Sequence, residues 1–260
     1  MEIFGYLLAA LVGISPGLIG GGGSILTVPI LVYVMGLNPV LANSYSLFKV
    51  GSTSLVGAVN NYYKGFVNIK TALLFGASSI TTGFITRKLL MPLIPSVLFS
   101  SAHFRITQSM ATMVLFAILM LLASIAMITN KDEASPTKTV TVPYNINIAS
   151  LLFFGILIGL ATGFLGAGGG FLLIPALVLL LKMPMKNAIG TSLLIIALNS
   201  LIGFTGDIGH YIIDWKFLII ITLVAVAGIF IGGLLAKKLD GEKLKKGFGW
   251  FVLLMGIYIF

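Results

Sequence analysis

The chain contains no cysteine, and charged residues make up only 9% of its 260 positions. The absence of cysteine excludes disulfide bonds and thiolate metal sites. Soluble domains carry about 25% charged residues and disordered chains are still more polar, so both classes are excluded. With 58% hydrophobic residues, the sequence predicts an all-α polytopic membrane protein. The net charge of +9 is explained by cations that hold cytoplasmic loops in place, so no nucleic acid is expected as a partner.

Eight apolar stretches are candidates for membrane segments, each of which needs about 20 residues. They cover about 3–35, 43–62, 69–86, 106–128, 148–181, 188–206, 217–236 and 247–260. The chain starts Met1-Glu2-Ile3, without the basic residues of a secretory signal peptide, so we expect no cleaved leader. Residues 129–147 are polar, which predicts an extramembrane linker.

The two halves of the chain repeat each other. Pro29 and Pro175 are 146 residues apart, and at this offset five glycines, Ser46-Leu47, Gly57 and Lys70 fall on identical residues without a gap. The sequence therefore predicts two repeats of four membrane segments each, residues 1–128 and 148–260, joined by the linker 129–147.

The distribution of lysine and arginine favours two repeats of the same orientation. The loops after the third, fifth and seventh segments are basic and are expected in the cytoplasm; their cations are Arg87, Lys88, Arg105, Lys182, Lys186, Lys237, Lys238, Lys243, Lys245 and Lys246. Both termini are then expected outside, together with Lys64, Lys70, Lys131, Lys138 and Lys216. The alternative is a pair of inverted repeats, which requires segments one and five to be re-entrant hairpins.

A glycine cluster interrupts the first segment of each repeat, and we expect both clusters to line a substrate site. Runs of glycine break a helix, and broken helices at membrane depth occur only inside protein or beside water. The N-terminus of a half-helix attracts anions. The alternative is that the glycines only permit close helix packing. The candidate residues are Gly20, Gly21, Gly22, Gly23 and Ser24 in the first repeat and Gly166, Gly168, Gly169 and Gly170 in the second.

The second segment of each repeat carries polar side chains that share a helix face. Ser46, Lys49 and Thr53 are spaced three and four residues apart. These side chains either face the site or form hydrogen bonds between helices. The full set of candidates is Asn43, Ser44, Ser46, Lys49 and Thr53 in the first repeat and Thr191, Ser192 and Asn199 in the second.

Lys49 is a cation placed well inside a predicted span. Such residues are costly in a bilayer and usually functional, so a lone cation beside hydroxyl groups suits an anionic substrate. Alternatively, Lys49 snorkels to the cytoplasmic interface, since it is only six residues from the start of the stretch at Asn43. Ile195 occupies the equivalent position, so the site is expected to be asymmetric.

Carboxylates are scarce, with only seven aspartates and glutamates in the chain. Asp207 and His210 are spaced for proton relay or metal binding, but nothing else completes a metal site. We therefore expect no metal, no cofactor and no catalytic cluster, and the protein is not expected to be an enzyme.

The duplicated motifs resemble those of the sulfite exporter TauE/SafE family of bacterial membrane proteins. The resemblance rests on the glycine-rich blocks Gly17–Pro29 and Gly163–Pro175, which are followed by Ala42–Leu47 and Ala188–Leu193. It implies a multi-pass protein of the bacterial cytoplasmic membrane that exports sulfite, sulfoacetate or a related small sulfur-containing anion.

The expected function is a secondary transporter that exports such an anion by alternating access between the repeats. The alternatives are a passive small-anion channel and an uptake permease for another small anion. The expected partners are a small anionic substrate, the lipid bilayer and, in a homo-oligomer, further copies of the chain.

The substitutions Gly22→Leu and Gly169→Leu test the glycine clusters. If these glycines form the site, each variant still inserts into the membrane but loses anion transport, because a bulky side chain fills the break. Flux in proteoliposomes measures this effect, and normal flux in both variants would leave the glycines a packing role only.

Overall fold

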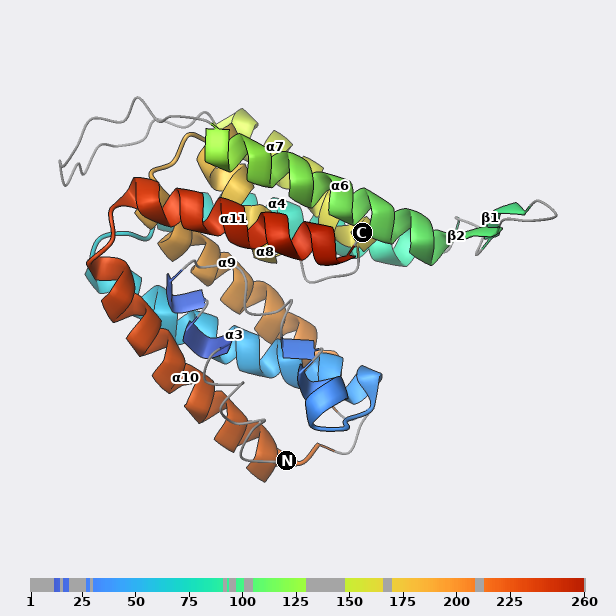
Figure 1. The fold of residues 1–260 in the computed structure, drawn as a ribbon, viewed down its shortest axis with the longest axis horizontal. Coiled ribbons are helices and arrows are strands. Elements are labelled where there is room, and N and C mark those ends of the chain that lie inside the picture. Colours follow the sequence, from blue (N-terminus) through green and yellow to red (C-terminus); the bar gives the residue numbers. More distant parts are fainter. Residues whose placement is uncertain are drawn as a thin grey trace. The chain divides into compact units, whose positions relative to one another are not determined.

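The computed structural model describes residues 12–14, 16–18, 27–28, 30–90, 93, 97–100, 105–129, 148–165, 170–208 and 213–259. These residues are largely helical, as the sequence predicts (Figure 1). The exception is a small antiparallel hairpin, β1–β2, which lies where a basic loop was expected. The elements are η1 (Ile30–Val34), α3 (Pro39–Tyr63), α4 (Ile69–Ile85), η2 (Thr86–Leu90), β1 (Val97–Ser100), β2 (Arg105–Thr107), α6 (Gln108–Thr129), α7 (Ile148–Leu165), α8 (Gly170–Pro175), η3 (Ala176–Leu180), α9 (Met185–Thr205), α10 (Trp215–Lys237) and α11 (Gly241–Ile259), the η elements being π-helices.

Two helices of the described part of the chain, α9 and α10, are long and apolar enough to cross a membrane. Shorter apolar stretches, Ala117–Thr129 and Ile148–Thr162, lie in α6 and α7. The total of eight membrane segments therefore stays a prediction.

The chain forms two compact units, and each of them combines parts of both halves of the sequence. Unit 1 contains Met1–Leu73 and Met185–Leu244, and unit 2 contains Leu74–Pro184 and Lys245–Phe260. The compact units thus follow packing rather than the sequence repeats, and the division into 1–128, 129–147 and 148–260 stays a prediction about the repeats.

Residues 146 apart have the same local structure where the first segment of each repeat ends. The π-helices η1 and η3 are equivalent at this offset. Met35 N–H donates to the Ile30 carbonyl at 3.2 Å, and Leu181 N–H donates to the Ala176 carbonyl at the same distance. Gly36, with φ 71°, closes the first turn in the left-handed region that glycine adopts readily, and Lys182 follows it there with φ 50°.

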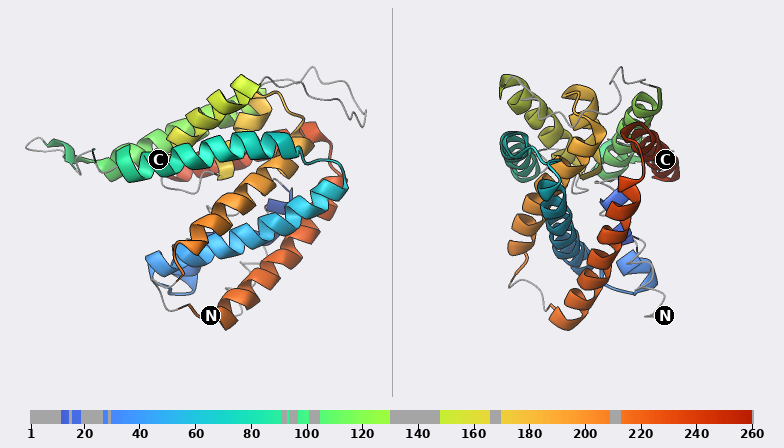
Figure 2. Two further views of the ribbon diagram at one scale, coloured as in Figure 1. Left: turned by 180° about the vertical axis from the view of Figure 1, so that it is seen from behind. Right: turned by 90° about the vertical axis from the view of Figure 1, so that its left-hand side faces the viewer.

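The equivalent helices α3 and α9 pack against each other in unit 1 and run antiparallel (Figure 2). A β-carbon on Gly57 of α3 would lie 3.1 Å from Leu193 Cδ1 of α9. The equivalent glycine, Gly203 of α9, faces Leu47 of α3 in the same way, at 3.5 Å from Leu47 Cδ1. Leu47 and Leu193 are themselves 146 residues apart, so the contact is reciprocal, as across a two-fold axis.

Two hydrogen bonds show the same exchange at opposite ends of the helix pair. Asn68 N–H donates to Thr191 Oγ1 at 3.1 Å, and Asp214 N–H donates to the Tyr45 hydroxyl at 2.7 Å. Asn68 and Asp214 are equivalent in sequence, as are Tyr45 and Thr191. The side chains of Asn68 and Asp214 also cap the next helix identically, each accepting a bond at 3.0 Å from an N–H in its first turn, that of Thr71 or Phe217.

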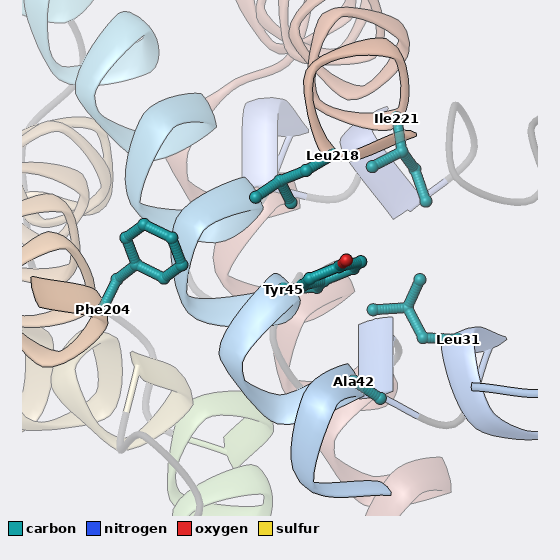
Figure 3. Packing of buried hydrophobic residues seen from close by; sticks show 6 residues of the cluster. All are labelled: Leu31, Ala42, Tyr45, Phe204, Leu218 and Ile221. Carbon is teal, nitrogen blue, oxygen red and sulfur yellow. The ribbon is translucent and has the colours of Figure 1, made fainter. Parts of the chain in front are cut away.

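Tyr45 also belongs to the apolar core of unit 1 (Figure 3). It is 2% exposed, and its ring lies among Leu31, Leu218 and Ile221 while its hydroxyl reaches the start of α10. Burial of a tyrosine in this way is favourable because the ring is removed from water and the hydroxyl keeps a partner.

These contacts correct the predicted orientation of the repeats. Two repeats of the same orientation would place α3 and α9 parallel, whereas the two helices are antiparallel and related by a reciprocal contact. The inverted alternative requires a re-entrant fifth segment, and in unit 2 η3 does pack against α7. If α7 continued as one straight helix, η3 would lie well beyond its end and could not contact it. The contact therefore means that α7 and η3 lie side by side.

Close packing of a small residue on a helix backbone also recurs at the same offset. In unit 1, a β-carbon on Gly13 would collide with the backbone of Ala225 in α10. In unit 2, a β-carbon on Gly159 of α7 would approach the Ser79 carbonyl of α4 to 2.5 Å. In each unit, the first segment of one repeat therefore packs on the third segment of the other.

The C-terminal end of α3 lies beside the C-terminal end of α10. Two lysines that were predicted on the outer side therefore lie at the same end as Lys237. Burial lowers the pKa of Lys64, and the neighbouring charge of Lys237 lowers it further. Lys64 therefore lies at the same end of unit 1 as Lys237, not on the opposite side of the membrane. Lys70, in the first turn of α4, lies at this end as well.

Cysteine cross-linking tests the antiparallel arrangement against a chain that has no native cysteine. We expect oxidation to join Leu47→Cys to Gly203→Cys, and Gly57→Cys to Leu193→Cys. A protease site placed in the 129–147 linker allows a gel to show whether the two halves stay attached.

The matched control is Leu47→Cys with Leu193→Cys, the pair that parallel repeats would bring together. These positions are ten residues out of register in the antiparallel pair, about 15 Å along the helix. Efficient cross-linking of this control instead of the first two pairs would contradict the inverted arrangement.

Candidate functional site

Lys49 is buried in the middle of unit 1. It lies ten residues after Pro39, the first residue of α3, which is about 15 Å along the helix. Its side chain is 3% exposed, and Nζ donates a long hydrogen bond of 3.4 Å to Thr27 Oγ1. Thr27 is itself 1% exposed and belongs to the first segment of the repeat. A cation and a hydroxyl from different segments therefore meet inside the protein.

The burial of Lys49 argues against snorkelling to the interface. The predicted segment began at Asn43, but α3 begins four residues earlier, so Lys49 is further from the end of the helix than expected. Lys243 forms an ion pair with Asp240, and both side chains are largely exposed and remote from Lys49 in sequence. Lys49 thus forms no ion pair with a described carboxylate.

The hydroxyl groups near Lys49 on α3 are buried, but they are not equally available. Thr53 Oγ1 lies 2.8 Å from the Lys49 carbonyl and 3.1 Å from the Val50 carbonyl, so its proton is used by its own helix. Ser46 is 4% exposed. Ser44 is 1% exposed, and its Oγ has no hydrogen-bond partner among the described residues. Asn43, by contrast, is exposed.

At the equivalent positions of α9, the hydroxyl groups of Thr191 and Ser192 form hydrogen bonds within the protein. Ser192 Oγ donates to the Ile189 carbonyl at 3.0 Å, and Thr191 accepts the bond from Asn68. Asn199 is partly buried. Ile195 replaces Lys49 and is 1% exposed. The first repeat therefore carries the charge, and the second repeat has the apolar Ile195 at the equivalent position.

The glycine clusters are largely beyond what the structure describes. Gly20, Gly21, Gly22, Gly23, Ser24, Gly166, Gly168 and Gly169 lie outside the described residues. Gly170 is described and buried, as the first residue of the short helix α8. The substrate role of both clusters stays a prediction.

Thr27 and Tyr45 were missed in the sequence, although each contributes a contact that organises unit 1. The repeat offset links Tyr45 to Thr191, which was a candidate, so the offset alone pointed to Tyr45. The carboxylate of Asp214 caps α10. Asp207 lies in the turn that follows α9, and His210 is outside the described residues.

Comparison with known proteins gives one consistent result. The family model for "Sulfite exporter TauE/SafE" matches residues 6–259. A probable membrane transporter protein of Xylella fastidiosa (strain 9a5c) is 30% identical over 252 residues, which cover 96% of this chain and 91% of the relative. The probable membrane transporter protein YunE of Bacillus subtilis (strain 168) is 27% identical over 263 residues, covering 92% and 89%. A probable membrane transporter protein of Haemophilus influenzae is 26% identical over 277 residues, covering 98% and 96%.

Amine labelling measures the burial of Lys49 directly. In protein held in lipid nanodiscs, a water-soluble amine-reactive ester is expected to modify Lys70 and Lys216, which are exposed, but not Lys49. Mass spectrometry of the peptides reports the modified positions, and labelling after denaturation checks that the Lys49 peptide is detectable. Modification of Lys49 at the rate of Lys216 in the folded protein would restore the snorkelling interpretation.

Proposed function

The chain belongs to the sulfite exporter TauE/SafE family, and on that basis we propose that it exports a small sulfur-containing anion by alternating access. It is a membrane transporter and not an enzyme. The proposed cargo is sulfite, sulfoacetate or another organosulfonate, carried across the bacterial cytoplasmic membrane.

The buried contact between Lys49 and Thr27 is the observation that supports an anionic cargo. An ammonium group without a carboxylate partner attracts a small oxyanion, and hydroxyl groups replace part of the hydration of the sulfur oxygens. The glycine cluster ends in Ser24, and the three residues from there to Thr27 span at most about 11 Å of chain. The proposed site therefore combines Lys49, Thr27, Ser46 and the backbone N–H groups of the first cluster.

The reciprocal packing of α3 and α9 supports alternating access as the mechanism. Inverted repeats allow a carrier to expose one site to either side of the membrane when the two halves exchange conformations. The contacts at the two ends of the pair, Tyr45 with Asp214 and Thr191 with Asn68, are chemically similar. Opening of either end therefore breaks a comparable set of bonds, which keeps the two states close in free energy.

The charges of unit 1 favour one orientation. One end of the α3–α9 pair gathers six cations, namely Lys64, Lys70, Lys186, Lys237, Lys238 and Lys243. The other end, within the described residues, has Lys216 with Asp207 and Asp214. Since cytoplasmic loops are enriched in lysine and arginine, we place the first end in the cytoplasm.

Transport in proteoliposomes tests this function. Labelled sulfite, sulfoacetate and methanesulfonate are expected to show saturable flux and counterflow, in which unlabelled anion on one side drives labelled anion in from the other. Linear, non-saturating conductance would favour a passive channel instead. Absence of flux for every small anion tested would overturn the proposal.

The substitution Lys49→Gln should weaken the apparent affinity for the transported anion by at least tenfold, because removal of one charge-assisted hydrogen bond costs about 1.5–3 kcal/mol. Lys216→Gln, at the exposed start of α10, is the matched control and should leave affinity unchanged. Equal affinity in the wild type and in Lys49→Gln would remove Lys49 from the site.

A further inference from the structure

A charge at the position of Lys49 is poorly compensated when no anion is bound. The side chain is buried, with 3% exposed, and its hydrogen-bond partner among the described residues is a neutral hydroxyl. Removal of an ammonium group from water without a counter-charge is costly, whereas a neutral amine of the same shape avoids most of that cost. Binding of an anion beside this side chain therefore stabilises the protonated amine relative to the neutral amine.

Among the described residues, other titratable groups on the elements packed against α3 do not offset this cost. The described residues of the first segment that precede η1, which supply Thr27, include no titratable side chain. On α9 the described titratable residue is Lys186, and on α10 they are Lys216 and Lys237, all near helix ends. Asp214 precedes α10, and its carboxylate is engaged by the Phe217 N–H. Tyr33 of η1 is 86% exposed, and on α3 Tyr45 is bonded to Asp214, while Tyr62 and Tyr63 lie in the last turn.

We propose that Lys49 couples the transport of each monovalent anion to one proton. The step is a balanced association, in which the neutral amine, one proton and one anion form an ammonium–anion pair. Release on the other side returns both the proton and the anion and leaves the amine neutral. This inference rests on the proposed function, because it requires that an anion reaches Lys49.

Coupling of this kind has a consequence for the energetics of transport. The empty site and the loaded site are both electrically neutral, so neither crosses the bilayer with a net charge. For a monovalent anion the flux should then follow the gradients of anion and proton but not the membrane potential. A lysine that stayed charged throughout would instead make transport sensitive to voltage.

The repeat asymmetry adds an independent argument. Three pairs of equivalent positions in α3 and α9 make reciprocal contacts, namely Tyr45 with Thr191, Leu47 with Leu193 and Gly57 with Gly203. Lys49, however, is matched by Ile195, which is also buried. A cation required only for architecture would be expected on both sides of such a pair. One titratable amine gives one proton per transport cycle.

Proton uptake on anion binding tests the proposal. Isothermal titration calorimetry of the full-length protein in nanodiscs, repeated in buffers of different ionisation enthalpy, counts the protons taken up. Methanesulfonate is the first probe, because a sulfonate binds no proton near neutral pH, and sulfite, corrected for its own titration, is the second. On the alkaline side, where the amine of the empty site is neutral, we expect close to one proton per anion and an apparent Kd that rises up to about tenfold per pH unit.

Two variants separate the proton on Lys49 from protons elsewhere. Lys49→Arg keeps a permanent charge, since guanidinium does not release its proton in proteins, so it should bind the anion with no proton uptake and with a Kd independent of pH. Lys216→Arg is the matched control and should behave as the wild type. If Lys49→Arg is not monodisperse, the pH dependence of the wild-type Kd decides alone.

The outcomes distinguish the two levels of the proposal. Binding of the anion without proton uptake, or proton uptake that persists in Lys49→Arg, would overturn the coupling role of Lys49 and leave the transporter function intact. Failure of both anions to bind or to be transported would overturn the proposed function itself, and the coupling with it.

Discussion

The antiparallel packing of α3 against α9 is the constraint on which the rest of unit 1 depends. The pair has glycines where the helices approach each other, and leucines from the equivalent position of the partner helix fill that space. Each helix also supplies a hydroxyl, from Tyr45 or Thr191, to the backbone N–H that precedes a helix of the other repeat. Because loss of these partly buried hydrogen bonds is unfavourable, they help to fix the register and the direction of the pair together.

The same packing determines where a charge can be held. Lys49 lies near the middle of α3, away from both helix ends, and Thr27 of the first segment covers it. The second repeat contributes Ile195 at the matching place, so the first repeat alone places a buried charge there. A scaffold of reciprocal contacts therefore holds one buried charge, which makes the proposed site asymmetric.

Much of the fold was predictable from the sequence, because composition and apolar stretches depend on local properties of the chain. The helical class, the repeat offset and the burial of Lys49, Ser46 and Thr53 all follow from such patterns. The orientation of the repeats was predicted wrongly, since the count of lysines assumed that Lys64 and Lys237 lie on opposite sides. Helix direction depends on contacts between residues far apart in sequence, such as Asn68 with Thr191, and charge counts do not contain that information. Thr27 was missed for a related reason, because only packing brings it to Lys49.

Reciprocal contacts of this kind are those that two copies of one half-length chain make in a two-fold dimer. A dimer of separate halves in a membrane needs equal numbers of copies inserted in opposite directions, and it dissociates when either becomes scarce. Joining the halves through residues 129–147 removes both conditions, since every chain then brings its own partner at a fixed ratio. The joined chain also lets the two halves diverge. Lys49, which has Ile195 at the equivalent position of α9, is a difference that a dimer of identical halves cannot have.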